Sequence, residues 1–464
     1  MHSHYPRLSL ADRSFLRVET AGGMDHIAAL CVLDGRPLVD AEGNLDLAAI
    51  RRRVELRLAR VPELRRMVHR PPPFGGPLLW VDDPDFCIDR HVRVTAVAPP
   101  GDEAALLEAA VRIASPLIDH SHPLWEIWLL TGLADSRVGM VFKIHHAVAD
   151  GLAVVAMIVS MFDLEPNAPD PALTEWSPQP APRRSQLVKD NLGCRLSACG
   201  SVIAHPLVGW HNVTTLVTEV RRLSRLRTAA PRSSVNARVG MSRCARVVHI
   251  DLEMSRTVAH MHGAKVNDVF LSIVTGGLRD LLIGRGERVD GTELVAGVPA
   301  TLRSAQAARG MGNASGGLMV RLPVGVSGAE RRLELIAAAT RTAKSEQRAA
   351  SIQAMMDWLG AAGLTQRYAA TQRMVNVMAT NVPGPPMPLY FLGSKIEDVM
   401  PMIGTGGNVT LVFAALSYGG RLNMVVNADA KACPDIDVLI TGMERTWAEY
   451  ADVTASRNVP GLSA

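Results

Sequence analysis

The hydrophobic residues of the chain recur at spacings that predict both helices and strands. Between residues 47 and 61, apolar side chains repeat every three or four positions, as on one face of an amphipathic helix. These positions are Leu47, Ile50, Val54, Leu58 and Val61. Asp46 stands where a helix N-cap is expected, and Pro62 cannot continue a helix, so these two residues mark its predicted ends.

Similar patterns predict further elements along the whole chain. Helices are predicted at residues 104–114, 152–162, 207–226 and 267–282, with more helices within residues 328–378. Strands are predicted at residues 27–33, 138–144, 246–251, 294–298, 409–416 and 422–427, and a turn at residues 8–12. Because strands and helices are interspersed without a strict strand–helix–strand rhythm, the predicted fold class is α+β, or mixed α/β.

A proline-rich segment separates the two halves of this pattern. Its prolines are Pro166, Pro169, Pro171, Pro178, Pro180 and Pro182. Such a segment is typical of a linker that runs over a surface, and 464 residues are too many for one ordinary core. We therefore predict an N-terminal domain at residues 1–165, an interdomain linker with a helix at 166–242, and a C-terminal domain at 243–464.

Composition excludes several classes of protein. Aromatic residues make up only 4% of the chain, which argues against a nucleic-acid stacking surface. The six cysteines are scattered without zinc-binding spacing, so we expect reduced thiols and no metal. There is no run of eighteen apolar residues and no apolar leader at the start. We therefore expect a cytoplasmic protein without a membrane-spanning helix.

The run from His145 to Gly151, which reads HHAVADG, is the strongest candidate for chemistry. A strand is predicted to end at this run and a helix to begin just after it, so a side chain there can project into a cleft. A neutral imidazole can accept a proton from an attacking hydroxyl near neutral pH. His146 is therefore the candidate general base, Asp150 a candidate helix cap, and Gly151 part of the turn that orients the ring.

A purely structural interpretation stands beside this one. A histidine at the end of a strand is commonly a core or surface residue, and an Asp-Gly pair at a helix start is commonly only a cap. The full HHxxxDG pattern after an apolar strand favours function. Acyl transfer from a thioester also fits, because the thioester is already activated and no serine or cysteine nucleophile is required.

Further short blocks follow the same order along the chain as blocks of a known family. They are residues 115–119, Pro123-Leu124-Trp125-Glu126, Asn267-Asp268-Val269, Val298-Pro299 with Arg303, Gly312-Asn313, Thr380-Asn381-Val382-Pro383-Gly384-Pro385 and Ser417-Tyr418-Gly419-Gly420. Together with HHxxxDG, these blocks resemble the bacterial wax ester synthase/diacylglycerol acyltransferase family. The resemblance covers roughly residues 8–430, which is nearly the whole chain.

The resemblance implies two domains, each like chloramphenicol acetyltransferase, with a tunnel between them. It implies that His146 deprotonates a lipid alcohol, which attacks an acyl-CoA thioester and releases CoA. Acyl-CoA is then a substrate, and no cofactor is expected. The role of His145 in catalysis stays open, and Asp150 is expected to hold the loop.

The other blocks each have two interpretations. The Pro123-Leu124-Trp125 block is either a turn with a core tryptophan, which we favour, or a substrate contact. Asn267, ahead of Asp268, is either a helix N-cap or a donor to the developing oxyanion. Asn381, with Thr380, either stabilises the turn that follows or faces the tunnel. Arg303 either pairs with a carboxylate or contacts CoA.

The family resemblance favours diacylglycerol as the acceptor, with a long-chain alcohol as the alternative. Other readings are a condensation domain, an acyltransferase for a small alcohol, and a non-catalytic protein of lipid inclusions. Residues 202–227 combine apolar positions with an arginine-rich end. This segment is either a contact with a membrane or lipid droplet or a helix packed at the domain junction.

Overall fold

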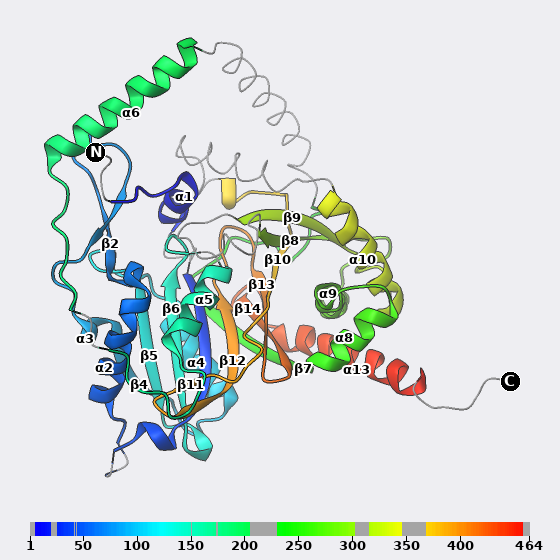
Figure 1. Cartoon of the computed structure of the whole chain (residues 1–464). Coiled ribbons are helices and arrows are strands. Elements are labelled where there is room, and N and C mark those ends of the chain that lie inside the picture. Colours follow the sequence, from blue (N-terminus) through cyan, green and yellow to red (C-terminus); the bar gives the residue numbers. More distant parts are fainter. Residues whose placement is uncertain are drawn as a thin grey trace.

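The computed structural model describes residues 5–19, 26–40, 42, 44–149, 151–172, 175–204, 230–301, 315–345 and 368–457. Within these residues, the strands form two six-stranded sheets and one small two-stranded sheet (Figure 1). Helices are interspersed among the strands along the chain. The predicted mixed α/β class is therefore confirmed.

The first sheet has the strand order β11-β12-β1-β6-β5-β4. Its strands are β1 (His26–Asp34), β4 (Val92–Ala96), β5 (Trp125–Thr131), β6 (Arg137–His145), β11 (Tyr390–Phe391) and β12 (Ser394–Ile403). β12 pairs antiparallel with β1, with Leu30 opposite Met400. β11 and β12 therefore fall within the predicted C-terminal domain, residues 243–464, although they belong to the first sheet. Figure 1 shows β12 beside the N-terminal strands.

The second sheet has the strand order β7-β14-β13-β10-β8-β9. Its strands are β7 (Arg243–Asp251), β8 (Leu294–Thr301), β9 (Ser315–Leu322), β10 (Val377–Val382), β13 (Leu411–Tyr418) and β14 (Arg421–Asp429). The small sheet pairs β2 (Arg66–His69) with β3 (Leu79–Asp82). Each of the six predicted strands is present, lengthened or shifted by a few residues at its ends.

The helices largely follow the predicted periodicity. In the described residues they are α1 (Leu10–Val18), α2 (Leu47–Arg57), α3 (Ile88–His91), α4 (Glu103–Ala114), α5 (Gly151–Met161), α6 (Arg184–Ala204), α8 (Leu252–Met261), α9 (Val266–Gly284), α10 (Ala329–Ser345) and α13 (Ile436–Arg457). Asp46 caps α2 as predicted, accepting a hydrogen bond from the Ala49 N–H at 2.9 Å. Beyond Arg57 the chain tightens into a 3₁₀ turn that ends before Pro62.

Five α-helices of the described residues differ from the sequence prediction. Where a turn was predicted, residues after Ser9 form α1, because Ser9 and Asp12 make a reciprocal capping box that satisfies two backbone N–H groups. The helices α3, α8 and α13 were not predicted, nor was α6, which lies in the predicted linker. The helix predicted at residues 207–226 lies outside the described residues.

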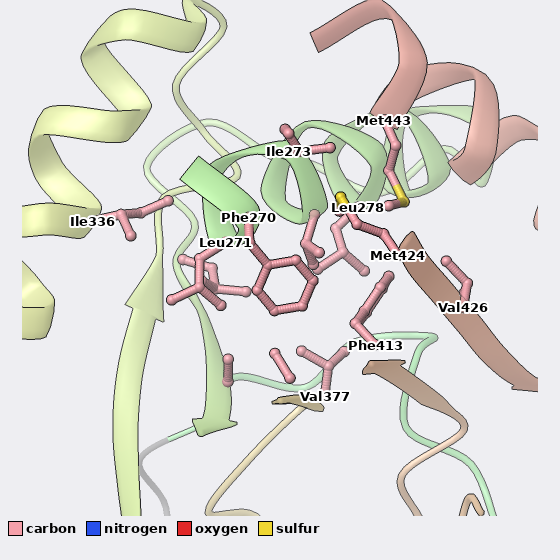
Figure 2. Packing of buried hydrophobic residues seen from close by; sticks show 14 of the residues in the cluster. Phe270, Leu271, Ile273, Leu278, Ile336, Val377, Phe413, Met424, Val426 and Met443 are labelled. Carbon is pink, nitrogen blue, oxygen red and sulfur yellow. The ribbon is translucent and has the colours of Figure 1, made fainter. Parts of the chain in front are cut away.

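Each sheet packs its helices around its own hydrophobic core. In the second half, α9 lies against the sheet, and Figure 2 shows the ring of Phe270 directed toward the strands, close to Phe413 of β13. A third cluster joins the halves, because Leu106 of α4 and Met400 of β12 share it with Ala245 of β7 and Val425 of β14. The two halves are thus connected by packed side chains as well as by the crossing chain.

Candidate active site

The HHxxxDG run lies in the strand-to-helix turn that the sequence predicts. β6 ends at His145, and α5 begins at Gly151. β6 pairs with β1, which sets His26 opposite His145. The turn after the strand is closed by a hydrogen bond from the Val148 N–H to the His145 carbonyl at 3.0 Å. Asp150, the predicted cap, lies outside the described residues.

The ring of His145 is held inside the protein by a hydrogen bond from the backbone. Its side chain is fully buried, and its Nδ1 accepts a hydrogen bond from the backbone N–H of Ala147 at 2.9 Å. A neutral imidazole has one nitrogen that accepts and one that carries the proton, so the proton belongs on Nε2. That Nε2 lies 3.5 Å from a carboxylate oxygen of Glu19. His145 therefore has no accessible lone pair with which to take a proton from a substrate.

His146 occupies a different environment, although it is the next residue. It is partly buried, and its ring stacks on that of Phe15 from α1. The ring centroids are 4.2 Å apart and the two planes are inclined by 15°. This contact restricts the plane of the imidazole. Of the two histidines, His146 is the more exposed.

The buried carboxylate of Glu19 lies close to three histidine side chains near this loop. Glu19 lies just past α1, and its side chain is only 4% exposed. One of its oxygens lies 3.0 Å from His26 Nε2, and the other lies 2.7 Å from His120 Nε2. Burial alone would raise the pKa of Glu19, but the hydrogen bonds from His120, His145 and His26 hold it well below its usual value. Glu19 is therefore an anion at neutral pH.

The donor atoms of Glu19, His120 and His145 lie within 4.8 Å of one another, close enough to hold a metal ion. A histidine that ligates metal through Nε2 almost always donates its Nδ1–H to a neighbour. His145 Nδ1 instead accepts a hydrogen bond. The geometry therefore fits a hydrogen-bonded carboxylate better than a metal centre.

These partners were missed by the sequence reasoning. Nothing in the local pattern around Glu19, His26 or His120 marks them as neighbours of the motif. The spacing of Ser9 and Asp12, a capping box before an apolar stretch, is the one pattern that could have predicted α1.

The Pro123-Leu124-Trp125 block supports the loop from the core. Trp125 is 1% exposed and donates its Nε1–H to the Leu64 carbonyl at 2.6 Å. His91 stacks on it and donates its Nδ1–H to the Trp125 carbonyl at 2.8 Å. The Leu124 carbonyl accepts a hydrogen bond from the His145 N–H at 3.0 Å. Of the two interpretations, the structure favours the core turn.

Residues of the second half reach the motif through the Thr380–Pro385 block. Thr380 and Asn381 lie in β10, partly buried, in parallel register with β13. At the end of β10, a Cβ built on Gly151 would meet Val382 Cγ2 at 3.7 Å. The start of α5 in one half and the end of β10 in the other are therefore neighbours.

The Asn267-Asp268 block lies at the start of α9. The N-cap of this helix is Lys265, so the prediction that Asn267 is the N-cap is wrong. Asn267 is instead the second helical residue, because the capping-box acid is Asp268, which accepts the Lys265 N–H at 2.9 Å. Asp268 thus has a structural role at the helix start. Arg303, Gly312 and Asn313 lie outside the described residues.

The two halves also meet around a cavity of about 30 Å³, lined by His26 among others. That volume holds about one water molecule. A tunnel for long-chain substrates stays a prediction of the family resemblance. Among the helices of the described residues, none is long and apolar enough to cross a lipid bilayer.

Two joined sheets, with the HHxxxDG loop between β6 and α5, form an acyltransferase fold. The chain belongs to the wax ester synthase/diacylglycerol acyltransferase family. The model of the family's catalytic domain matches residues 8–270, and that of its C-terminal domain matches residues 311–450. The protein is therefore an O-acyltransferase.

Individual relatives agree with this assignment. The chain is 30% identical over 465 residues to a Mycobacterium tuberculosis protein named probable diacylglycerol O-acyltransferase tgs1, with 97% of each chain covered. The solved wax ester synthase/diacylglycerol acyltransferase of Marinobacter aquaeolei VT8 is 23% identical, with a TM-score of 0.68 over 96% of this chain and 98% of that one. A condensation domain of the CDA synthetase shares the fold, with 17% identity, 97% of each chain covered and a TM-score of 0.57.

Proposed function

We propose that the protein transfers a long-chain acyl group from acyl-CoA to the hydroxyl of diacylglycerol, with His146 as the general base. The observation that carries this proposal is the contrast between the two histidines. His145 is fully buried, with Nδ1 accepting the Ala147 N–H and Nε2 3.5 Å from Glu19, whereas His146 is only partly buried and its ring plane is restricted by Phe15. The names of the relatives support diacylglycerol as the acceptor.

The proposed reaction needs one proton acceptor and no covalent intermediate on the protein. His146 takes the proton of the acceptor hydroxyl as the oxygen attacks the thioester carbonyl. The tetrahedral intermediate then collapses, the carbon–sulfur bond breaks, and the imidazolium returns the proton to the CoA thiolate. Asn267, Asn381 and Thr380 stay candidates for donors to the oxyanion.

A long-chain alcohol is the second candidate acceptor. It presents the same hydroxyl chemistry as diacylglycerol, and the name of the Marinobacter protein includes both activities. We also propose that the enzyme works peripherally at a membrane or lipid-inclusion surface, because both acceptors partition into lipid. Deletion of residues 206–227 with unchanged liposome binding would count against that segment as the contact.

The test is to incubate pure protein with palmitoyl-CoA and either dioleoylglycerol or hexadecanol, and to follow free thiol. We expect CoA release that falls by about 10²–10⁴-fold in His146→Ala, the usual contribution of a general base. His249→Ala is the matched control, because His249 pairs with Glu103, a residue of α4 that takes no part in the motif. An unimpaired His146→Ala enzyme would refute the mechanism. CoA release with hexadecanol but not with dioleoylglycerol would make a long-chain alcohol the acceptor in place of diacylglycerol.

A further inference from the structure

We propose that Glu19 is a positioning residue for this reaction, a buried hydrogen-bond acceptor that holds the HHxxxDG loop through His145 while Phe15, one helical turn earlier, holds His146. This inference rests on the proposed function, since it assigns a role relative to His146 as the base. It concerns residues outside the motif itself, contributed by α1 and the residue that caps it.

The first support is that one turn of chain touches both histidines. The Glu19 N–H donates to the Phe15 carbonyl at 3.1 Å, which makes Glu19 the C-cap residue of α1 and sets its side chain above that of Phe15. Phe15 stacks on His146 at 4.2 Å, and the Glu19 carboxylate faces His145 Nε2 at 3.5 Å. A shift of α1 would therefore disturb both rings together.

The second support is the tautomer of His145. Because Nδ1 accepts the Ala147 N–H, the ring needs its proton on Nε2, and that proton needs an acceptor inside the fully buried site. The carboxylate of Glu19, 3.5 Å from Nε2, is the acceptor that the structure places nearest to this proton. If Nε2 lost its acceptor and the proton moved to Nδ1, two N–H groups would face each other at the Ala147 hydrogen bond. The turn that presents His146 would then have to open.

The third support is that Glu19 joins several elements at one point. Its other contacts are to His26 in β1 and to His120 in the loop that leads into the Trp125 block. The rings of His26 and His120 stand edge-on to that of His145, with centroids 5.5 Å and 5.7 Å away. A carboxylate that contacts three imidazoles from separate segments resists movement of any one of them, because each displaced ring would move away from this shared acceptor.

The experiment compares Glu19→Leu, which removes both acceptor oxygens, with Glu19→Gln, which keeps one. We expect kcat to fall by about 10–10²-fold in Glu19→Leu, the range that small misplacement of a reacting group costs. KM for palmitoyl-CoA should change by about twofold or less, because no substrate contact is removed. Glu19→Gln should restore most of kcat. Glu103→Leu, which breaks an exposed pair with His249, is the matched control and should leave kcat unchanged.

A spectroscopic measurement tests the tautomer independently of activity. Imidazole ¹⁵N spectra of the wild-type protein, assigned by loss of the signal in His145→Gln, should show a protonated Nε2 and an unprotonated Nδ1. The opposite tautomer in the wild type overturns the proposal, whether or not Glu19→Leu folds. A normal kcat in folded Glu19→Leu also overturns it.

Two other outcomes are distinguishable. One equivalent of zinc in the purified protein, lost in Glu19→Leu, would replace the proposal with a metal centre. A wild-type protein inactive with both acceptors would refute the proposed function. The ¹⁵N spectra of wild type and Glu19→Gln would still decide whether Glu19 sets the His145 tautomer.

Discussion

Gly384, within the Thr380–Pro385 block, has no room for a side chain. A Cβ built on it would lie 2.0 Å from the carbonyl oxygen of Ser417, at the end of β13, and 2.8 Å from Leu416 Cδ2. The obstacle is backbone, which cannot swing aside as a flexible side chain can. Gly384→Ala therefore requires the turn after β10 to move away from β13 by about 1 Å, since non-bonded carbon and oxygen atoms stay more than about 3 Å apart.

The cost of Gly384→Ala has two parts. Overpacking of a close contact costs about 1–3 kcal/mol. The same movement strains the hydrogen bond from the Gly384 N–H to Ser417 Oγ, 3.1 Å long, whose loss is worth about 1 kcal/mol. We expect the free energy of unfolding to fall by about 2–4 kcal/mol, which for a cooperative chain of this length lowers Tm by about 2–4 °C.

Differential scanning calorimetry and the thiol-release assay check this prediction together. Activity should fall as well, because the block lies beside the start of α5. Gly328→Ala is the control: a Cβ there meets nothing within 4 Å, so stability should stay within about 0.5 kcal/mol. If Gly384→Ala matched Gly328→Ala in Tm and activity, the close approach of the two strand ends would be refuted.

Two further predictions concern the stability of the protein at acid pH and the space between Gly151 at the start of α5 and Val382 at the end of β10. Burial lowers the pKa of His91 to about 4 despite its hydrogen bond to the Trp125 carbonyl. As pH falls, the imidazole of His91 therefore takes up its proton in the unfolded chain at a higher pH than in the folded protein. Unfolding titrations should show that the wild type loses about 3 kcal/mol more stability than His91→Gln as pH falls from 7 to 4. Equal losses would contradict the neutral, buried imidazole. Gly151→Ala should leave Tm unchanged, because its Cβ would meet only Val382 Cγ2 at 3.7 Å. The same variant should lower kcat/KM, because the methyl group takes space beside the histidine loop, and unchanged kinetics would show that substrates do not use this gap.

Local patterns in the sequence determined much of the fold. The apolar spacing of residues 47–61, with Asp46 before it, predicts α2 and its cap. The apolar run that ends in two histidines predicts β6, the turn and α5. These elements could be predicted because helix and strand periods and caps are set by neighbours within a few residues. The HHxxxDG motif and its companion blocks likewise led to the family.

Only the tertiary structure decided which residues surround the motif and how its two histidines differ. The pairing of β1 with β6 sets His26 opposite His145, and β12 joins the first sheet from almost 400 residues along the chain. Sheet register and order depend on contacts between distant segments, which no local period encodes. In sequence His145 and His146 are adjacent and equivalent. In the fold, His145 ends β6 and is fully buried, with Nδ1 accepting the Ala147 N–H and Nε2 3.5 Å from Glu19, whereas His146 lies in the turn after the strand, is partly buried and stacks on Phe15.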